Sequence, residues 1–562
     1  MSIDTGDIVP RVYSGFRGVD LRGDEINLVR SPDALNVWKD YRETESIRTR
    51  PGMKLLHSFD DTVYGIFFYS AGGVNMTIVH SGTKLYKIVG GVRSELYSGV
   101  NKARSESFVY SGVWYFKDGA NYLSFDGKTI GEVVGYIPTT SIGRKPLGGG
   151  TIHEDVNLLS PYRINTFLAD GESKDFYLDA QNIDEEKPIV KVADKEVTAF
   201  TVDYAAGKIT FTTAPEKPLT DGQDTVSIQY KKIVDGYADR IKKCTLLTVF
   251  DNRVFFSGNK EFPNTMWHCS LNDPTYCSDL DYYNEGLDSA AVKGLVAGNN
   301  VLWVFREPSQ ANTTVFYHTP TIDSEYGKIY PNTHSSIATG CIGGAVNFND
   351  DIIFFSDRGM EGISGDITTE QVVAHRSTLV DRKLIAEKGY ANMLLAEWDG
   401  YLIVIIGNKA YLADSRAMFT NENHYEYEFF YWEMEKEIIS AKVEGGVLYL
   451  GTSDGVYSLT DNEKHIESYW TTPLDKFKAP HKLKTTNKRG CVVEAKGDIS
   501  VYVKTDKTEF ELIGTYENVT DAFVSRIKRK KWKDIQLKFY SNTRFSLETA
   551  TLEAFIGGYL KR

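Results

Sequence analysis

Short apolar runs alternate with turn residues along most of the chain. In residues 445–459, Gly-Gly precedes Val-Leu-Tyr-Leu, and Asp-Gly then precedes Val-Tyr-Ser-Leu. Gly-Gly and Asp-Gly supply the positive φ angles that two-residue hairpin turns require. The stretch therefore predicts two adjacent strands, and the same pattern returns with different letters along the chain.

Seven such turns precede an apolar strand, and they lie near residues 73, 112, 252, 300, 351, 400 and 446. Apart from one long gap after the second turn, they recur about every 40 to 50 residues, which is typical of a β-propeller. A four-stranded blade has two apolar faces, and blades stacked around an axis cover each other's faces. We predict about seven blades, in residues 61–146 and 234–472. Six or eight blades, or unrelated hairpins in several sandwiches, are the alternatives.

The long gap predicts an inserted domain. Residues 147–233 begin with Leu-Gly-Gly-Gly, which suggests a flexible junction, and continue as short alternating strands with frequent turn signals. This pattern predicts a small β-sandwich. A second β-sandwich is expected in residues 473–562, where Ile535, Leu537 and Phe539 alternate with polar residues as one buried face requires.

The first 60 residues show little regular pattern. We therefore expect residues 1–60 to form an extended N-terminal arm that crosses the surface of a neighbouring subunit or ring. Its contact residues are predicted to be Arg48, Arg50, Pro51 and Gly52.

Composition supports the all-β interpretation and limits the functions to consider. Aromatic residues make up 13% of the 562 residues, and there are 48 glycines, which favours strands and tight turns. The formal net charge of −12 argues against a general polyanion binder. Five scattered cysteines indicate a reducing compartment, and neither a signal peptide at Met1–Pro10 nor a run of membrane-spanning length is visible.

No catalytic or metal motif emerges from the sequence. The ten histidines are scattered, and there is no nucleophile elbow, phosphate loop or dinucleotide fingerprint, so we predict no enzyme, cofactor or metal site. Ser356-Asp-Arg-Gly359 and Ser453-Asp-Gly455 look superficially like the turn boxes of sialidase propellers. However, the Asp stands one place early and the Trp is missing, so turn chemistry explains them better. A glycoside hydrolase remains an alternative.

A carbohydrate-binding or receptor-binding propeller is the other alternative. It is suggested by the tyrosines and the tryptophan of residues 425–432, although their alternation is also what a packed strand would show.

One dense basic run stands out in this acidic chain. It lies beside Trp532 and consists of Arg526, Lys528, Arg529, Lys530, Lys531 and Lys533. Three interpretations fit the run: a solvated face, an interface with an acidic protein, or a surface that contacts nucleic acid phosphates.

Several short segments together resemble a known family. They are Gly18-Val-Asp-Leu21, Ser31-Pro-Asp-Ala-Leu-Asn36, Arg48-Thr-Arg-Pro-Gly52, the strand pair around Gly207-Lys-Ile-Thr-Phe211, and the C-terminal stretch Leu552–Tyr559. The chain is similar in outline to the tail nozzle, or packaged-DNA stabilisation (stopper, tail hub), proteins of short-tailed bacteriophages.

The resemblance implies a structural virion protein with a β-propeller. Such a viral tail protein would form a ring, a homohexamer, around the axial DNA channel, as part of the head-tail connector. The ring would extend the portal-adaptor assembly, retain packaged DNA and permit DNA ejection. The implied partners are other copies of the chain, portal, adaptor and other tail proteins, tail fibres or spikes, and double-stranded DNA bound without sequence specificity. The implied location is the virion tail, after assembly in the bacterial cytoplasm.

Overall fold

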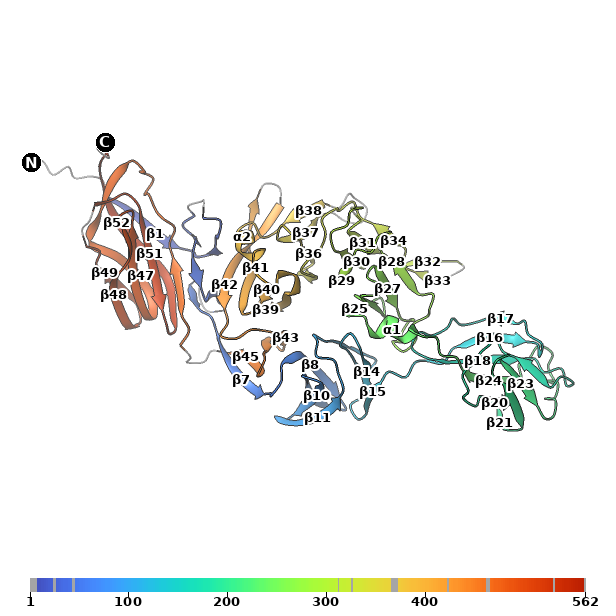
Figure 1. Cartoon of the computed structure of the whole chain (residues 1–562). Coiled ribbons are helices and arrows are strands. Elements are labelled where there is room, and N and C mark those ends of the chain that lie inside the picture. The colour runs from blue at the N-terminus through green and yellow to red at the C-terminus, as the bar shows by residue number, and fades with distance from the viewer. Residues whose placement is uncertain are drawn as a thin grey trace, which may run out of the picture. The chain divides into compact units, whose positions relative to one another are not determined.

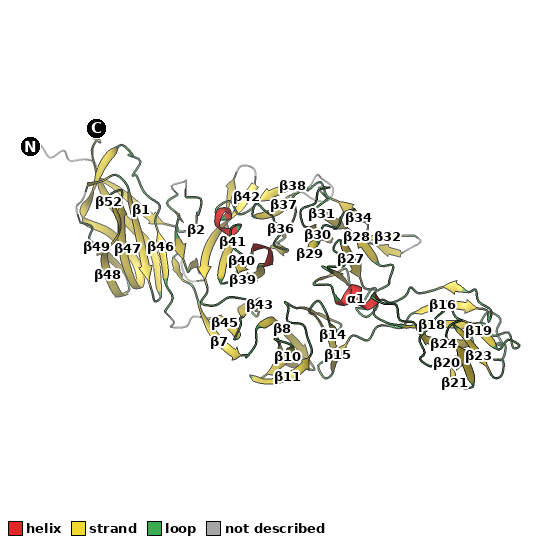
Figure 2. Cartoon of the chain, viewed as in Figure 1, coloured by secondary structure: helices red, strands yellow, loops and turns green. Residues whose placement is uncertain are grey.

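The structure is a computed structural model that describes residues 8–559, apart from 24–26, 43–45, 312, 325–326, 365–371, 422–423, 461–464 and 529–530. Nearly all of its regular structure is β-strand (Figure 2), which confirms the prediction of an all-β chain. The described helices are α1 (Tyr237–Lys242), α2 (Asp381–Leu384) and the short 3-10 helix η1 (Tyr390–Asn392).

The chain divides into two compact units. Unit 1 comprises Met1–Phe68, Val79–Gly82 and Thr339–Arg562, and unit 2 comprises Tyr69–Ile78 and Thr83–Ala338.

Seven sheets of four strands each follow one another along the described chain (Figure 1). The first two contain β8 (Val63–Ala71), β9 (Val74–Ser81), β10 (Lys84–Val89) and β11 (Val92–Ser98), then β12 (Glu106–Tyr110), β13 (Val113–Lys117), β14 (Tyr122–Phe125) and β15 (Ile130–Glu132). The third and fourth contain β25 (Leu246–Phe250), β26 (Arg253–Ser257), β27 (Thr265–His268) and β28 (Tyr282–Asn284), then β29 (Val292–Gly298), β30 (Val301–Arg306), β31 (Val315–His318) and β34 (Asn332–His334). A separate hairpin of β32 (Thr321–Asp323) and β33 (Gly327–Ile329) precedes β34.

The last three sheets belong to unit 1. They contain β35 (Ala345–Phe348), β36 (Asp351–Phe355), β37 (Met360–Ser364) and β38 (Val372–His375); then β39 (Leu394–Trp398), β40 (Tyr401–Ile406), β41 (Lys409–Asn421) and β42 (His424–Glu433); and finally β43 (Ser440–Glu444), β44 (Val447–Gly451), β45 (Gly455–Thr460) and β7 (Gly52–Ser58). In the last sheet the fourth strand, β7, comes from near the start of the chain.

Each apolar strand that the sequence pattern singled out is the second strand of one of these sheets. β40 is the clearest case, because all six of its residues are buried. The turn before it has Asp399 and Gly400 at φ angles of 49° and 75°, as the Asp-Gly signal requires. The turn signals and apolar runs therefore located these strands correctly.

Successive sheets pack through aromatic residues inside each unit. In unit 2, Tyr122 of the second sheet meets Phe256 of the third with ring centroids 5.7 Å apart. Phe250 of the third sheet and Leu302 of the fourth share one apolar cluster. In unit 1, Trp398 of β39 donates a hydrogen bond of 3.0 Å to the carbonyl of Gly446, in the turn before β44.

The inserted module is built from two sheets around one core, and its first strand begins at Thr139, before the predicted boundary at residue 147. One sheet contains β17 (Thr151–Ile152), β16 (Thr139–Arg144), β18 (Tyr162–Phe167), β24 (Val226–Lys231), β20 (Ile189–Val192) and β21 (Lys195–Val197), and the other contains β19 (Asp175–Tyr177), β23 (Lys208–Phe211) and β22 (Phe200–Asp203). Phe167 of the first sheet packs edge-on against Phe176 of the second at 5.4 Å. The glycines at 148–150 were predicted to form a flexible junction at the start of the module. They lie instead in the hairpin between β16 and β17, inside the module.

The C-terminal module is organised around one long strand, β47 (Lys482–Thr505). On one side β47 pairs with β48 (Thr508–Val519), β49 (Ala522–Ser525) and β50 (Lys531–Trp532), and it also pairs with β51 (Ile535–Ser541) and β52 (Phe545–Tyr559). β46 (Ser468–Thr471) pairs with β51, so the module begins slightly before the predicted boundary at residue 473.

The N-terminal arm differs from the prediction of a segment extended over a neighbour. It forms β1 (Ile8–Ser14), β2 (Gly18–Val19), β3 (Arg30–Ser31), β4 (Ala34–Leu35), β5 (Val37–Lys39), β6 (Ile47–Thr49) and β7. β1 pairs with β52, and β4 and β6 pair with β46 and β52, so the arm adds strands to the C-terminal module. Several of its apolar side chains, such as Trp38 at 2% exposure, are buried in this chain's own core.

The four predicted arm contacts are also made within the chain. Arg50 is 2% exposed, and its guanidinium donates to the Asn36 side chain and to the carbonyl of Glu433. Arg48 lies 3.4 Å from Asp40, while Pro51 and Gly52 are buried where β7 begins. These residues hold the arm to the rest of unit 1. Little of their side chains is exposed for a neighbouring subunit to contact.

Candidate functional site: a basic face on the C-terminal module

The C-terminal module carries a charge opposite to that of the rest of the chain. Residues 473–562 contain 19 Lys and Arg against 11 Asp and Glu, whereas residues 1–472 contain 45 against 65. The C-terminal module is therefore the part of the chain that attracts anions, whereas the net charge of the rest repels them.

Two buried apolar residues, Ile527 and Trp532, hold the predicted basic run against the module, and most of its described charged side chains face solvent. Arg526, Lys528 and Lys531 are exposed and Lys533 is half-buried, while Ile527 is 8% exposed. Arg529 and Lys530 lie outside the described residues. The alternation of buried and exposed positions explains why a segment so rich in charge holds a defined place against β47.

Trp532 has a structural role that the sequence did not reveal. It is 1% exposed and packs edge-on against Phe477, with ring centroids 5.4 Å apart. The prediction placed this tryptophan beside a run that could contact phosphates, but no face of its indole is open to a ligand. Its function is to anchor the run to the module.

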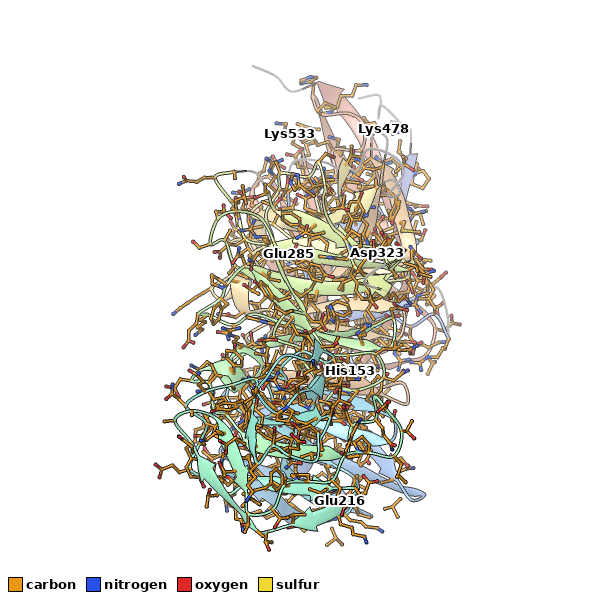
Figure 3. The ribbon with its side chains drawn as sticks, turned by 90° about the vertical axis from the view of Figure 1, so that its right-hand side faces the viewer. His153, Glu216, Glu285, Asp323, Lys478 and Lys533 are labelled. Carbon is orange, nitrogen blue, oxygen red and sulfur yellow. The ribbon has the colours of Figure 1, made fainter. Side chains whose placement is uncertain are left out.

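A second basic segment, missed in the sequence, lies beside the first. Phe477 sits between Lys476 and Lys478, and Lys482 follows at the start of β47. The contact of Phe477 with Trp532 therefore holds the two segments together, and Figure 3 shows Lys478 and Lys533 at the same end of the module. We call the combined surface the basic face: Lys476, Lys478, Lys482, Arg526, Lys528, Lys531 and Lys533.

Lys484 connects the two segments from inside. Its Nζ donates a hydrogen bond of 2.7 Å to the carbonyl of Lys533, and the residue is fully buried. Burial lowers the pKa of this amine, although Asp534, Asp475 and Asp506 oppose the shift. A signal was present in the sequence, since residues 476–484 contain four lysines at even-numbered positions, 476, 478, 482 and 484.

Two carboxylates near the basic face, those of Asp475 and Asp506, bind other groups. Asp475 is 2% exposed, accepts a hydrogen bond of 2.6 Å from Arg11 and another of 3.2 Å from Tyr13, and thereby fastens β1. Asp506 accepts the backbone N–H of Lys533 at 2.7 Å. Among the residues that the structure describes, Lys478, Lys528 and Lys531 have no ion-pair partner, so their charge is available to a ligand.

A histidine between two carboxylates elsewhere in unit 1 resembles part of a catalytic triad. His375 Nε2 lies 2.6 Å from Asp381, and Nδ1 lies 3.1 Å from Glu361. Burial alone would lower the pKa of His375, but the hydrogen bonds and charges of Asp381 and Glu361 outweigh it and raise this pKa to about 10. With both nitrogens held as donors, the ring is a structural cation and has no lone pair to act as a base.

The His375 cluster gives a prediction about pH. A group whose pKa is raised on folding stabilises the folded state below its unfolded pKa near 6.5, and this contribution is lost as the pH rises toward 10. We expect unit 1 to lose about 2 kcal/mol across this window, less than the full shift implies because the ring is partly solvated. Thermal unfolding of the wild type and of His375→Gln at several pH values measures it. Equal pH dependence in the two proteins would contradict the assignment.

The aromatic run 425–432, which suggested carbohydrate binding, forms core. Tyr427, Phe429, Phe430, Tyr431 and Trp432 are each 3% exposed or less. Trp432 donates to the carbonyl of Val37, and Tyr427 to Asp351. Tyr427, Tyr431 and Trp432 are therefore not open to a glycan. Tyr425 is 37% exposed, and the guanidinium of Arg376 lies 4.0 Å from the centre of its ring.

The two sialidase-like stretches serve as turns. Ser356 Oγ accepts the backbone N–H of Arg358 and lies 3.2 Å from Glu361, so it closes the turn between β36 and β37. Asp454, between β44 and β45, accepts from Thr452 and pairs with Lys436 at 2.7 Å. These contacts agree with the prediction that both stretches are turn chemistry.

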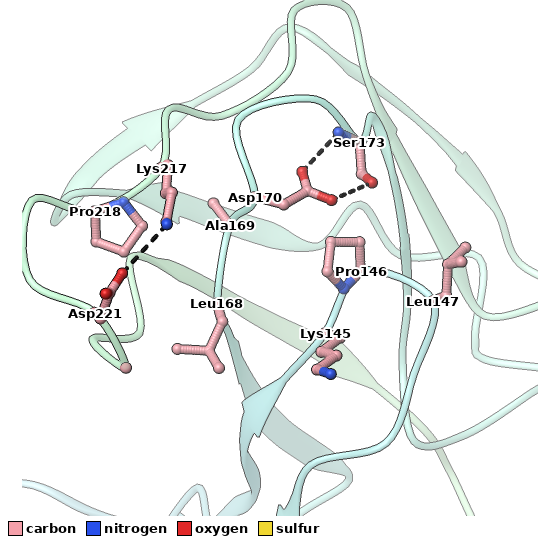
Figure 4. Close-up of a pocket in the computed structure, with 11 residues that line it drawn as sticks. Lys145, Pro146, Leu147, Leu168, Ala169, Asp170, Ser173, Lys217, Pro218 and Asp221 are labelled. Carbon is pink, nitrogen blue, oxygen red and sulfur yellow. Dashed lines mark hydrogen bonds and ion pairs between the residues drawn. The ribbon is translucent and has the colours of Figure 1, made fainter.

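The inserted module has a pocket of about 370 Å³ at the ends of three loops (Figure 4). The loops are 145–147, 168–173 and 217–222, and the lining is mostly apolar. Its polar groups are engaged locally: Lys217 pairs with Asp221 at 3.2 Å, and Asp170 accepts from Ser173. The pocket lining contains no histidine and no aromatic ring, so it offers no stacking surface for a sugar.

Within the described residues, no group of three or more His, Cys, Asp or Glu side chains is arranged so that it could hold a metal ion. None of the helices in this part of the chain is long and apolar enough to span a membrane. All five cysteines are buried and unpaired.

Comparisons with known proteins identify no family. No family model matches the chain, and no curated protein matches it. Distant likenesses occur among solved structures. BamB from Moraxella catarrhalis has 10% identity and a TM-score of 0.32 over 72% of this chain and 96% of BamB. The dihydro-heme d1 dehydrogenase NirN has 8% identity and a TM-score of 0.31 over 91% of this chain and 83% of NirN.

An exo-beta-1,3-galactanase from Phanerochaete chrysosporium has 8% identity and a TM-score of 0.22 over 90% of this chain and all of the galactanase. Likenesses this distant carry no argument about what the present chain does.

Proposed function

We propose that this chain is a structural subunit of a short-tailed phage tail. Its seven four-stranded sheets are the blades of a β-propeller, and its copies assemble into a ring, with six expected, around the axial DNA channel. The ring extends the portal-adaptor assembly, retains packaged DNA and lets it pass during ejection. The role is mechanical and requires no catalytic residue or cofactor.

One observation carries the propeller part of the proposal: within unit 1, the beginning of the first sheet lies against the last sheet. β7 completes the last sheet and ends at Ser58, and β8 of the first sheet begins at Val63. Ser440 Oγ donates a hydrogen bond of 2.9 Å to the carbonyl of Val63, and Phe68 packs on Tyr449 at 4.9 Å. These two contacts place the start of the first sheet against the last sheet, as the first and last blades of a closed ring would be.

The charge distribution supports the proposed position around DNA. Residues 1–472 carry an excess of 20 negative charges. An acidic channel lining repels phosphates and lets a duplex slide, whereas a basic lining would hold it through released counterions. The segments that resemble tail nozzle proteins, such as Gly18-Val-Asp-Leu21, support the same assignment.

The experiment that tests this function is the stoichiometry of the chain in purified phage particles. Quantitative mass spectrometry of virions should find about six copies per tail, in a fixed ratio to the portal protein. Particles that lack the chain should package DNA but release it before infection. Absence of the chain from purified virions would contradict the proposal.

A further inference from the structure

We infer that the basic face of the C-terminal module binds an acidic surface of a second copy of this chain, outside that copy's C-terminal module. This inference rests on the proposed ring and specifies which surface one copy contributes to the contact with its neighbour. The alternative occupant of a basic face, a nucleic acid duplex, is an outcome of the test below.

Charge complementarity identifies the partner. The C-terminal module has an excess of eight positive charges and the remaining 472 residues an excess of 20 negative charges. Each copy therefore carries both the basic surface and an acidic counterpart. In a solution of this protein, the most abundant anionic partner for the basic face is another copy.

The exposed apolar side chains next to the basic segments favour a protein over DNA. Val524 is 46% exposed and precedes Arg526 by two positions, and Leu474 is 38% exposed and precedes Lys476 by two. A phosphate backbone offers nothing for aliphatic side chains to pack against, whereas protein interfaces combine apolar centres with arginine and polar rims. Trp532, the one aromatic residue in the run, is buried and cannot stack on a base.

The contact has the symmetry that a ring requires. A basic surface on one copy and an acidic surface elsewhere on the next form a heterologous interface, because the two patches are different parts of the chain. Heterologous contacts repeat from copy to copy until the rotation closes a ring. A contact of the basic face with itself would place like charges together and is disfavoured.

The face is supported from within the module by tertiary contacts. The Phe477–Trp532 contact and the hydrogen bond from Lys484 to the carbonyl of Lys533 fix the backbone under the lysines. A preformed surface loses less conformational entropy on association, so charge removal should affect assembly without unfolding the module.

The test uses the full-length chain with three charge reversals, Arg526→Glu, Lys528→Glu and Lys531→Glu. The matched control carries Lys174→Glu, Lys191→Glu and Lys195→Glu, three exposed lysines of the inserted module that change the net charge equally. Sedimentation velocity measures assembly at low and high ionic strength, and fluorescence anisotropy measures binding of a labelled DNA duplex. Thermal unfolding confirms that both variants are folded.

We expect the reversals in the basic face to weaken assembly by about 10- to 100-fold, while the control assembles as the wild type does. High salt should weaken wild-type assembly in the same direction. If the basic-face variant forms normal rings, the inference is wrong and the proposed ring stands. If it forms normal rings and loses duplex binding, the basic face is a DNA surface. If the wild type forms no ring under any condition, the proposed function fails together with the inference.

Discussion

Gly18→Ala is expected to release the N-terminal arm from β42 and to lower the free energy of unfolding by about 3 kcal/mol or more. Gly18 lies in β2 at a φ of 141°, which side chains with a Cβ rarely adopt. An added Cβ would lie 2.1 Å from the carbonyl oxygen of Phe429, and this neighbour is backbone that cannot rotate away. The arm must therefore move from β42. Denaturant-induced unfolding monitored by tryptophan fluorescence measures the loss, because Trp38 and Trp432 are in this core.

Gly15→Ala is the matched control for this substitution. Gly15 also has a positive φ, at 63°, but no atom lies within 4 Å of an added Cβ. Alanine at this position suffers only the strain of a positive φ, so the free energy of unfolding should fall by about 1 kcal/mol. If the two substitutions cost the same, the close approach of the arm to β42 is not a feature of the folded chain.

The second large effect is expected at the ion pair that joins the arm to β42. Arg30 Nε and an Nη atom donate to the two carboxylate oxygens of Glu428 at 2.8 and 2.7 Å, and the Glu428 side chain is fully buried. Burial raises the pKa of Glu428, while Arg30 opposes the shift. Arg30→Met leaves a buried carboxylate without its main partner, which should cost about 3 to 5 kcal/mol.

A second variant separates the loss of the pair from the cost of an unpaired charge. The double substitution Arg30→Met with Glu428→Gln removes both charges and should recover a large part of the stability. An exposed pair gives the scale for comparison: Lys217→Met breaks the contact with Asp221, where both side chains are more than half exposed, and should cost less than about 0.5 kcal/mol. A loss at Arg30 as small as that at Lys217 would contradict the buried bridge.

The sequence predicted the strands whose signals are local. At β40 and β44, a two-residue turn and an uninterrupted apolar run specify a strand without reference to distant residues, and both lie where the pattern placed them. The arm could not be predicted in this way. β4 and β6 are two or three residues long, and they pair with β46 and β52, which lie hundreds of positions away.

The candidate site was predictable in part, for the same reason. A run of like charges is visible in any sequence, so Arg526, Lys528 and Lys531 were found. The second segment around Lys476 and Lys478 was not found, because only the tertiary contact between Phe477 and Trp532 brings it to the same surface. That contact also explains why the tryptophan supports the face from within and does not take part in binding.

The central claim is that copies of this chain form a closed ring around a channel. Electron microscopy of the purified full-length protein tests it most directly, through a three-dimensional reconstruction without imposed symmetry. We expect a cyclic ring of six copies around an open central channel that admits duplex DNA. In each copy, the seven four-stranded sheets should close into one propeller. A monomer at every protein concentration, or an assembly without a central channel, would contradict it.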